Sequence, residues 1–409
     1  MHRFQRVGLA LLAAAAGCGR EPEPAPAPPA APPQARRGLW VLCQGSQRVL
    51  DQPERIDALL GDAAALGATD LFVQVYRGGR AWFDSSRADP EPFERNRDAA
   101  GEDTLAALLA RAGEAGLRVH AWVNVLNLAD NRDAPLVRDL GPGAVLVDQA
   151  GRSLLDYPGL DVPPPDRRYH RLGTPGVWLD PGAPGVAERL VETFAELVAR
   201  YPQLYGLHLD YIRYPDVLPF SPGSRFGVGL DLGHGEATRR RFRDETGLEA
   251  PRPPEQLGNA DRWDTWRRDQ VTALVRRIAE AARAARPGLS LSAAVWAEAD
   301  RAYLAAGQDW RRWLEEDLLD FAVPMAYTLD GRLFGYQVDA LTGSSLGPRT
   351  WIGIGAWLFA KRPEGALEQV RRARESAAPG LVLFSWDSIA DAPALREALA
   401  AEAAGAAGG

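Results

Sequence analysis

Short apolar runs alternate with amphipathic segments along most of the chain. Eight runs have the length and the β-branched or aromatic content of strands. They are Leu39–Cys43, Leu71–Tyr76, Arg118–Val125, Tyr205–Ile212, Leu289–Trp296, Leu319–Ala326, Trp351–Gly355 and Leu381–Trp386. Apolar residues at helical spacing predict helices at Pro53–Leu66, Asp103–Ala115, Gly185–Ala199, Arg262–Ala285, Trp310–Glu316, Phe334–Leu341, Glu364–Ser376 and Ala392–Ala400.

This alternation of strands and helices predicts an α/β fold with a parallel sheet. Each parallel strand needs a long crossover to reach its neighbour, and a helix supplies it. Eight units predict a (β/α)8 TIM barrel. The alternative is an open doubly wound sheet, but no GxGxxG loop follows the first strand to support it.

The polar residues of the predicted strands fall on the face that would point to the barrel axis. Alternate residues of a barrel strand face the helices and the axis. On this alternation, the residues expected to face the axis are Gln74, Tyr76, His120, Trp122, Asn124, Gly206, His208, Asp210, Ile212 and Glu298. Barrel active sites are built at the C-terminal ends of the strands, where several of these residues lie. The parity therefore predicts a polar site at that end.

Two segments are too long for ordinary strand-to-helix loops of roughly 2–6 residues. Leu126–Pro184 follows the third strand, and Asp216–Arg262 follows the fourth. Because the loops after neighbouring strands share one rim, we expect both insertions to wall one side of a cleft. A long cleft suits a polymeric ligand, although an oligomer contact would also account for the insertions.

The N-terminal residues have the pattern of a secretory signal. Arg3 and Arg6 precede the apolar run Val7–Ala16, which is far shorter than the ~20 residues of a spanning helix. The end of the run, Ala15–Cys18, resembles the lipobox of bacterial lipoproteins, although that family prefers leucine where Ala15 stands. The resemblance implies a signal peptide at residues 1–17 and lipidation of Cys18. The alternative is secretion by simple cleavage after the small residues.

The remaining boundaries follow from composition. Residues 18–36 are rich in proline and almost free of large apolar side chains, which predicts a semi-rigid tether. The barrel is expected over residues 37–398 and an Ala/Gly tail over 399–409. Gly19 after the cysteine is the pattern that implies sorting to the outer membrane in Gram-negative lipoproteins. We therefore expect an envelope protein that is lipid-anchored and faces the periplasm.

The charge and cysteine counts exclude several classes of protein. The chain has 409 residues, with 47 basic and 54 acidic side chains and a formal net charge of −7. It therefore lacks the basic surplus of a nucleic-acid-binding protein. Two cysteines cannot form a disulfide scaffold.

Several motifs together resemble one family of proteins. The sequence LYGLHLDYIRYP (Leu204–Pro215) resembles the fourth-strand signature of the bacterial family-10-like glycosyl hydrolases. FVQVY, LRVHAWVNVLN, WLDPGAPGV, LSLSAAVW and GLVLFSWDSI fit in the same order, from Arg37 to about Ala392. Many members carry two consecutive aspartates in the fourth-strand motif, where this chain has Asp210 followed by Tyr211. The resemblance implies a barrel that hydrolyses an envelope polysaccharide, with peptidoglycan strands as the expected substrate.

Glycoside hydrolysis normally requires two carboxyl groups beside the scissile bond. Asp210 is the first candidate, and the pair His208-x-Asp210 resembles the Arg-x-Asp of the α-amylase clan, whose aspartate is the nucleophile. Glu298 matches the acid position of that clan. Asp180 and Asp387 are reserve acids near other strand ends. Asp210 could instead hold a loop or Arg213, Glu298 could be a solvated loop residue, and Asp180 could cap a helix.

Sugar binding requires aromatic faces together with polar groups. Aromatic residues at or just after strand ends are Tyr76, Trp122, Tyr327, Trp357 and Trp386. Polar candidates are His120, Asn124, His208 and Asp387. His120, His208 and Asp210 could hold a metal ion, but no HxH or HExxH pair is present, so we expect neither a metal nor a cofactor. Two alternatives to the hydrolase remain: a barrel lipoprotein that binds glycan without cleaving it, and a metal-dependent polysaccharide deacetylase.

Overall fold

The computed structural model describes residues 36–164, 166–219, 230–252 and 257–407. The chain divides into Met1–Gln34 and Ala35–Gly409, and the description concerns the second unit. The predicted signal peptide, Cys18 and the tether up to residue 35 lie outside the described residues. Within the described ranges, no helix combines the length and the apolar character needed to cross a membrane.

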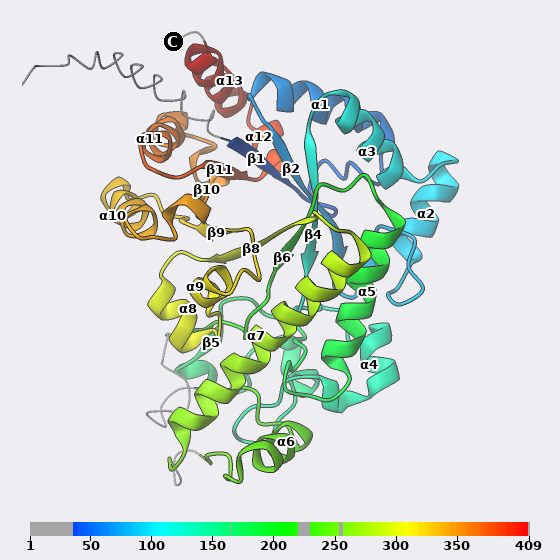
Figure 1. The fold of residues 1–409 in the computed structure, drawn as a ribbon, viewed down its shortest axis with the longest axis vertical. Helices are drawn as coiled ribbons and strands as arrows, with labels where there is room; N and C mark the ends of the chain where they lie inside the picture. The colour runs from blue at the N-terminus through cyan, green and yellow to red at the C-terminus, as the bar shows by residue number, and fades with distance from the viewer. Residues whose placement is uncertain (1–35, 165, 220–229, 253–256, 408–409) are drawn as a thin grey trace, which may run out of the picture. The chain divides into compact units, whose positions relative to one another are not determined.

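Eight parallel strands form a closed barrel, as predicted (Figure 1). In chain order they are β1 (Arg36–Val41), β2 (Asp70–Arg77), β4 (Arg118–Asn124), β6 (Gly206–Asp210), β8 (Ser290–Trp296), β9 (Phe321–Met325), β10 (Ile352–Gly355) and β11 (Gly380–Phe384). Each strand pairs with the next along the chain, and β1 pairs with both β11 and β2, which closes the ring. A short strand, β3 (Arg80–Ala81), pairs antiparallel with the end of β2.

All eight predicted helices are present. They are α1 (Ile56–Ala65), α3 (Thr104–Glu114), α5 (Val186–Arg200), α7 (Ala260–Ala285), α9 (Trp310–Glu315), α10 (Gly331–Thr342), α11 (Pro363–Arg374) and α13 (Pro393–Ala407). Among the described residues, five further α-helices were not predicted: α2 (Glu91–Ala100), α4 (Pro135–Leu140), α6 (Glu236–Thr246), α8 (Ala299–Ala305) and α12 (Trp386–Ala390). They are short or highly charged, so their apolar periodicity is weak.

The C-terminal boundary differs from the expectation. Helix α13 continues to Ala407, whereas the sequence suggested an Ala/Gly tail over 399–409. Alanine has the highest helix propensity, so an Ala-rich segment extends an existing helix readily. Glu402 also ties the helix to the barrel through ion pairs with Arg37 and Arg374.

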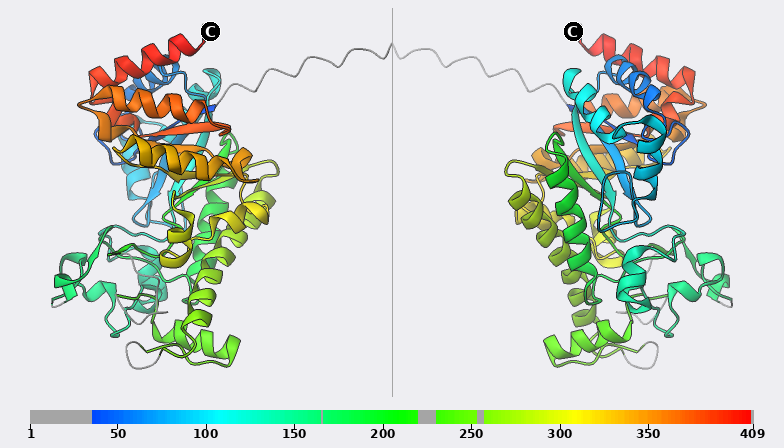
Figure 2. Two further views of the ribbon diagram at one scale, coloured as in Figure 1. Left: turned by 90° about the vertical axis from the view of Figure 1, so that its left-hand side faces the viewer. Right: turned by 90° about the vertical axis from the view of Figure 1, so that its right-hand side faces the viewer.

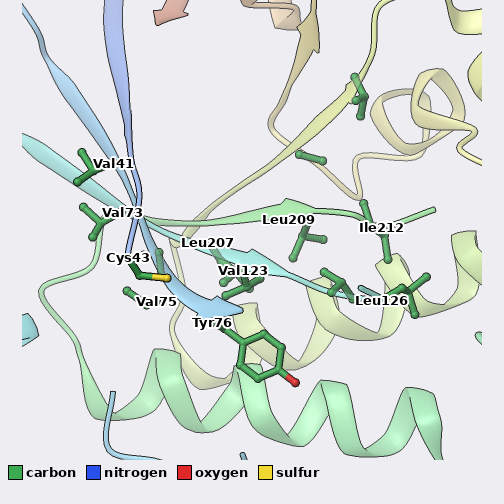
Figure 3. Packing of buried hydrophobic residues seen from close by; sticks show 14 of the residues in the cluster. Val41, Cys43, Val73, Val75, Tyr76, Val123, Leu126, Leu207, Leu209 and Ile212 are labelled. Atoms are coloured by element: carbon green, nitrogen blue, oxygen red, sulfur yellow. The ribbon is translucent and has the colours of Figure 1, made fainter. Parts of the chain in front are cut away.

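The barrel has two apolar layers. The inner layer fills the ring with large side chains that include Trp40, Phe72, Trp122 and Trp351. The outer layer joins the strands to the helices, and Figure 3 shows part of it around Val41, Val73, Val123 and Leu207. The inner layer supports the floor of any site at the end of the barrel.

The two predicted insertions follow β4 and β6, the third and fourth strands of the barrel. The first insertion holds β5 (Arg171–Leu172) and the second holds β7 (Val217–Leu218), and these two short strands pair antiparallel. A further bridge joins Asp148 to Leu232. Figure 2 shows both insertions at the end of the barrel opposite α13. The insertions therefore support each other on one rim.

Candidate functional site

A cavity of about 380 Å³ opens at the C-terminal ends of the strands. Its aromatic lining residues are Trp40, Trp122, Tyr211, Tyr327, Trp357 and Phe384. Its polar and charged lining residues are Gln74, Arg77, Asn124, Asn127, Thr174, Asp210 and Arg213. Apolar ring faces beside hydrogen-bonding groups are the combination that a sugar ring requires, because a sugar presents C–H faces and hydroxyl groups.

Asp210 is the only carboxylate among the described residues that line this cavity. Its side chain is 8% exposed; Oδ2 accepts a hydrogen bond from the Trp122 indole at 3.0 Å, and Oδ1 accepts one from the Tyr211 amide at 2.7 Å. Burial raises the pKa of Asp210 to about 6, against the lowering effects of the Tyr211 amide and the Arg213 charge. Asp210 is thus a fixed carboxyl that changes its charge near neutral pH.

The residues after Asp210 leave the strand alternation. Tyr211 has a left-handed backbone (φ +50°) and lines the cavity, while Ile212 is buried in the outer apolar layer. The expectation that Ile212 faces the axis is therefore wrong, because β6 ends at Asp210. Arg213 lies over the rings of Trp178 and Trp296 and pairs with Asp216, so its position is held from several sides.

His208 lies under the cavity floor. Its Nε2 accepts a hydrogen bond from the Trp40 indole at 3.1 Å, so its proton is on Nδ1 and is donated to the Ser292 hydroxyl at 2.8 Å. Burial lowers the pKa of His208 well below its usual value, which keeps the ring neutral. His208 therefore positions Trp40 and does not line the cavity itself.

His120 lies deeper in the barrel, also outside the lining of the cavity. Its Nε2 is 3.0 Å from Oδ1 of Asp70, and its ring stacks on Phe72. Burial alone would raise the pKa of Asp70, but hydrogen bonds from His120 and Arg36 lower it to about 2. The described part of the chain contains no group of three His, Cys, Asp or Glu residues placed to hold a metal ion.

Of the other predicted site residues, Trp122, Asn124, Tyr327 and Trp357 line the cavity. Asn124 accepts a hydrogen bond from Gln74 at 3.1 Å, and Tyr327 stacks on Phe384.

Trp386 and Asp387 lie elsewhere, because β11 ends at Phe384 and both residues belong to α12, which starts with a capping box at Ser385. The buried Trp386 indole donates to Asp62 at 2.9 Å, and Asp387 accepts hydrogen bonds from the backbone amides of Leu42 and Gln47.

Tyr76 points away from the cavity, contrary to its predicted parity. The pairing of β2 with β4 shifts by one residue between Gln74 and Tyr76, so Val75 is an extra residue on β2. Past this bulge the faces are exchanged, and the Tyr76 ring packs edge-on against Phe194 of α5 at 5.3 Å (Figure 3). Arg77 takes the inward position and lines the cavity.

Glu298 is partly exposed and does not line the cavity. It precedes α8, and its side chain accepts a hydrogen bond from Gln337 at 2.9 Å. In the pairing of β6 with β8, Leu209 is opposite Ala293, so Asp210 lies at the level of Ala294. Glu298 is four residues beyond Ala294, which corresponds to a distance of up to about 13 Å along an extended chain.

Asp180 is fully buried and does not line the cavity; it accepts hydrogen bonds from the Gly182 amide and the Thr238 hydroxyl.

A second cavity of about 390 Å³ adjoins the first one. The two cavities share Arg77, Ala129 and Pro175 as lining residues. The second cavity is also lined by Arg80, Asp130 and Gly176. Together they form a continuous cleft. Residues of the first insertion contribute to its wall as expected, whereas none of the described residues of the second insertion lines either cavity.

Sequence reasoning missed several lining residues. Trp40 has inward parity on the first strand, and this signal could have found it. Arg77 could not be found, because nothing in the sequence marks the bulge at Val75. Asn127 and Tyr211 follow the ends of their strands, where alternation no longer applies.

A closed barrel of eight parallel strands with this cleft at its C-terminal end has the architecture of a TIM barrel. It is similar to the catalytic domain of β-amylase from Paenibacillus polymyxa, with a TM-score of 0.53, 12% identity and coverage of 87% of this chain and 93% of that one. It is also similar to a β-galactosidase from Rahnella sp. R3, with a TM-score of 0.56, 14% identity and coverage of 90% and 56%. At these identities the likeness concerns the fold.

The sequence gives the family. Residues 35–344 match the model of the glycosyl hydrolase-like 10 family, and the chain belongs to this family. It is 26% identical over 278 residues to the glycosyl hydrolase DigH of Escherichia coli (strain K12), which covers 64% of this chain and 55% of DigH. It is 22% identical over 297 residues to the glycosyl hydrolase YngK of Bacillus subtilis (strain 168), which covers 68% and 50%. The chain therefore spans about half the length of the curated relatives it matches.

Proposed function

We propose that this protein is a glycoside hydrolase that cleaves a bacterial envelope polysaccharide, with peptidoglycan glycan strands as the substrate. The observation that carries the proposal is the buried carboxyl of Asp210 in an aromatic-lined cleft at the C-terminal end of the barrel. Membership of a glycosyl hydrolase-like family and the names of the relatives support the same reaction class. The sequence supports an outer-membrane lipoprotein anchored at Cys18, which would bring the cleft to the periplasmic polysaccharide.

Asp210 acts in its ionised form in this proposal. With a pKa of about 6 it is mostly charged at pH 7, and the Trp122 and Tyr211 hydrogen bonds aim its oxygens. A carboxylate in this position attacks the anomeric carbon or stabilises the oxocarbenium-like transition state. The aromatic rings hold the sugar against it, which supplies the orientation that the reaction needs.

Glu298 is the second carboxyl of the proposal and donates the proton to the leaving oxygen. To reach a scissile bond beside Asp210, the Glu298 side chain must break its hydrogen bond with the Gln337 amide.

A second candidate function follows from the same geometry. A cavity lined by one carboxylate among the described residues favours a barrel that binds glycan without cleaving it.

One experiment separates these functions. The purified protein is incubated with peptidoglycan strands that carry no peptides, with and without a chelator, and new reducing ends, released acetate and bound strands are all measured. Release of reducing ends that Asp210→Asn abolishes supports the hydrolase. Binding of the strands without new ends identifies the non-catalytic barrel. Release of acetate that a chelator stops identifies the deacetylase.

A further inference from the structure

Arg77 faces the junction of the two cavities because of the bulge in β2. The bulge directs Tyr76 to α5, and the next residue, Arg77, lines both cavities. Because Tyr76 packs against α5, alternation past the bulge puts Arg77 on the cavity side of the strand. Arg77 therefore presents a cation at the centre of the cleft.

This cation has no partner within the described residues. Of the other charged groups of the cleft, Arg213 pairs with Asp216 at 3.3 Å and Arg80 lies 3.7 Å from Asp89. Asp130 also lines the second cavity, but among the described residues it makes no ion pair with Arg77. Asp210 accepts its hydrogen bonds from Trp122 and Tyr211. Across the ranges that the structure describes, the Arg77 side chain makes no ion pair or hydrogen bond. A guanidinium is always charged and carries five N–H donors. We therefore expect a ligand bound in the cleft to supply an acceptor for Arg77.

Asn127, which lines the first cavity together with Arg77, supplies a second unpaired donor. Its Oδ1 accepts a hydrogen bond from the Ala129 amide at 3.0 Å, which fixes the orientation of the side-chain amide. The Nδ2 atom is buried and has no hydrogen-bond partner among the described residues, although Asn127 is 4% exposed and lines the first cavity. A Cβ on Gly176 would stand 2.7 Å from the Ala129 carbonyl oxygen and 3.3 Å from this nitrogen, and Gly176 lines the second cavity. A side chain at this position would therefore crowd the backbone first and the amide second.

We propose that Arg77 and Asn127 form a subsite that binds the carboxylate of an acidic sugar, and that this subsite selects anionic glycans as ligands. One unpaired guanidinium neutralises one negative charge, and N–H donors that converge on a planar carboxylate give both affinity and orientation. The inference rests on the proposed function for its glycan ligand. It names the chemical class, a carboxylate on a sugar, which occurs as the lactyl ether of muramic acid or as the C6 carboxylate of a uronic acid.

The test measures binding of three matched oligosaccharides to the purified chain carrying Asp210→Asn, which prevents turnover. The ligands are a muramic-acid-containing tetrasaccharide, the same compound with its carboxyl groups reduced to alcohols, and a uronic-acid tetrasaccharide. We expect the muramic-acid ligand or the uronic-acid ligand to bind about 10- to 100-fold more tightly than the reduced compound, which is the range of a charge-assisted contact. The acidic ligand that binds more tightly identifies the source of the carboxylate.

Variants then assign this preference to residues. Arg77→Gln should abolish it, while Arg77→Lys should keep part of it because lysine retains the charge without the fork of donors. Asn127→Asp keeps the acceptor for the Ala129 amide but replaces the unpaired donor with an oxygen, so it should also weaken binding of the acidic ligand. None of these three changes should affect binding of the reduced ligand. Arg97→Gln, which removes an exposed arginine paired with Asp98, is the control and should change nothing.

The outcomes separate this inference from the proposed function. Equal affinity for acidic and reduced ligands, or a preference that survives Arg77→Gln, overturns the carboxylate subsite even if the wild-type protein cleaves glycan. A preference that Arg77→Gln abolishes supports the subsite even if the wild-type protein releases no reducing ends. In that second case the hydrolase proposal is wrong, and the carboxylate subsite stands as part of a barrel that binds glycan without cleaving it.

Discussion

Asp210→Asn tests the central residue through stability as well as activity. The folded-state pKa of Asp210 is raised from 3.8 to about 6, so folding disfavours its ionised form. The resulting destabilisation is absent at pH values well below 3.8 and is complete above pH 6. Linkage gives a cost of about 1 kcal/mol at pH 4.5 and about 3 kcal/mol at pH 8. Asparagine is neutral at every pH and does not carry this cost.

Asparagine also introduces a cost of its own. Its oxygen can keep the bond from the Tyr211 amide, but its NH₂ group then faces the Trp122 indole N–H, donor against donor. This mismatch costs ~1–3 kcal/mol at all pH values. The pH-independent cost cancels when two pH values are compared, so the test is how the difference in unfolding free energy between variant and wild type changes with pH. Relative to wild type, the variant should gain about 2 kcal/mol of unfolding free energy between pH 4.5 and pH 8, measured by urea denaturation.

Activity should fall by about 10³-fold or more in the same variant, because asparagine cannot supply the negative charge. In wild type, kcat/KM should decline as the pH falls through about 6, where Asp210 becomes protonated. Asp180→Asn is the matched control. Asp180 is fully buried with a pKa also raised to about 6 by burial, yet it does not line the cavity. It should show a similar pH-dependent stability change with normal turnover.

Two results would refute this reasoning. Near-normal hydrolysis by Asp210→Asn would show that another residue carries the chemistry. A stability difference that does not vary with pH would show that the folded environment leaves the carboxyl unperturbed.

Four further predictions concern the acid, the sugar platform, a buried tryptophan outside the cavity and the anchor. Glu298→Gln should slow polymer hydrolysis but largely spare an activated aryl glycoside, whose leaving group needs little protonation; equal loss on both substrates argues against the acid role. Trp357→Ala should weaken glycan binding about 3- to 10-fold, measured by titration calorimetry, because this half-exposed ring lines the cavity. Trp386→Ala should instead lower the unfolding free energy by ~3–5 kcal/mol with unchanged glycan affinity in the folded protein, since its ring is buried outside the cavity. Cys18→Ser should move the protein from the membrane fraction to the soluble one, and unchanged partitioning on immunoblots would reject lipidation.

The barrel could be predicted because its strands are buried on both faces. Such strands appear as apolar runs whatever their neighbours, and all eight runs correspond to barrel strands. Strand parity also predicted Trp122, Asn124 and Asp210, which lie on regular parts of β4 and β6. These residues follow from period-two alternation alone.

The other predicted site residues were misplaced where the strands stop alternating between inward and outward side chains. Tyr76 lies past a bulge, and Trp386 lies past a helix start that depends on the cap at Ser385. Glu298 follows the end of β8, where the chain turns into α8. Bulges and caps arise from local hydrogen bonds that a single sequence does not specify strongly, so the walls of the cleft needed the structure.

The extra residue at Val75 decides which of two neighbouring side chains reaches the cleft. If β2 alternated regularly from Gln74, the Tyr76 ring would face the barrel axis and the Arg77 guanidinium would face the apolar side of α5, where an unpaired charge is strongly unfavourable. Deleting Val75 would place Tyr76 directly after Gln74 and still opposite Val123, so both side chains would keep their faces. The composition of the cleft would therefore survive loss of the bulge residue, because the pairing of β2 with β4 beyond the bulge sets these faces.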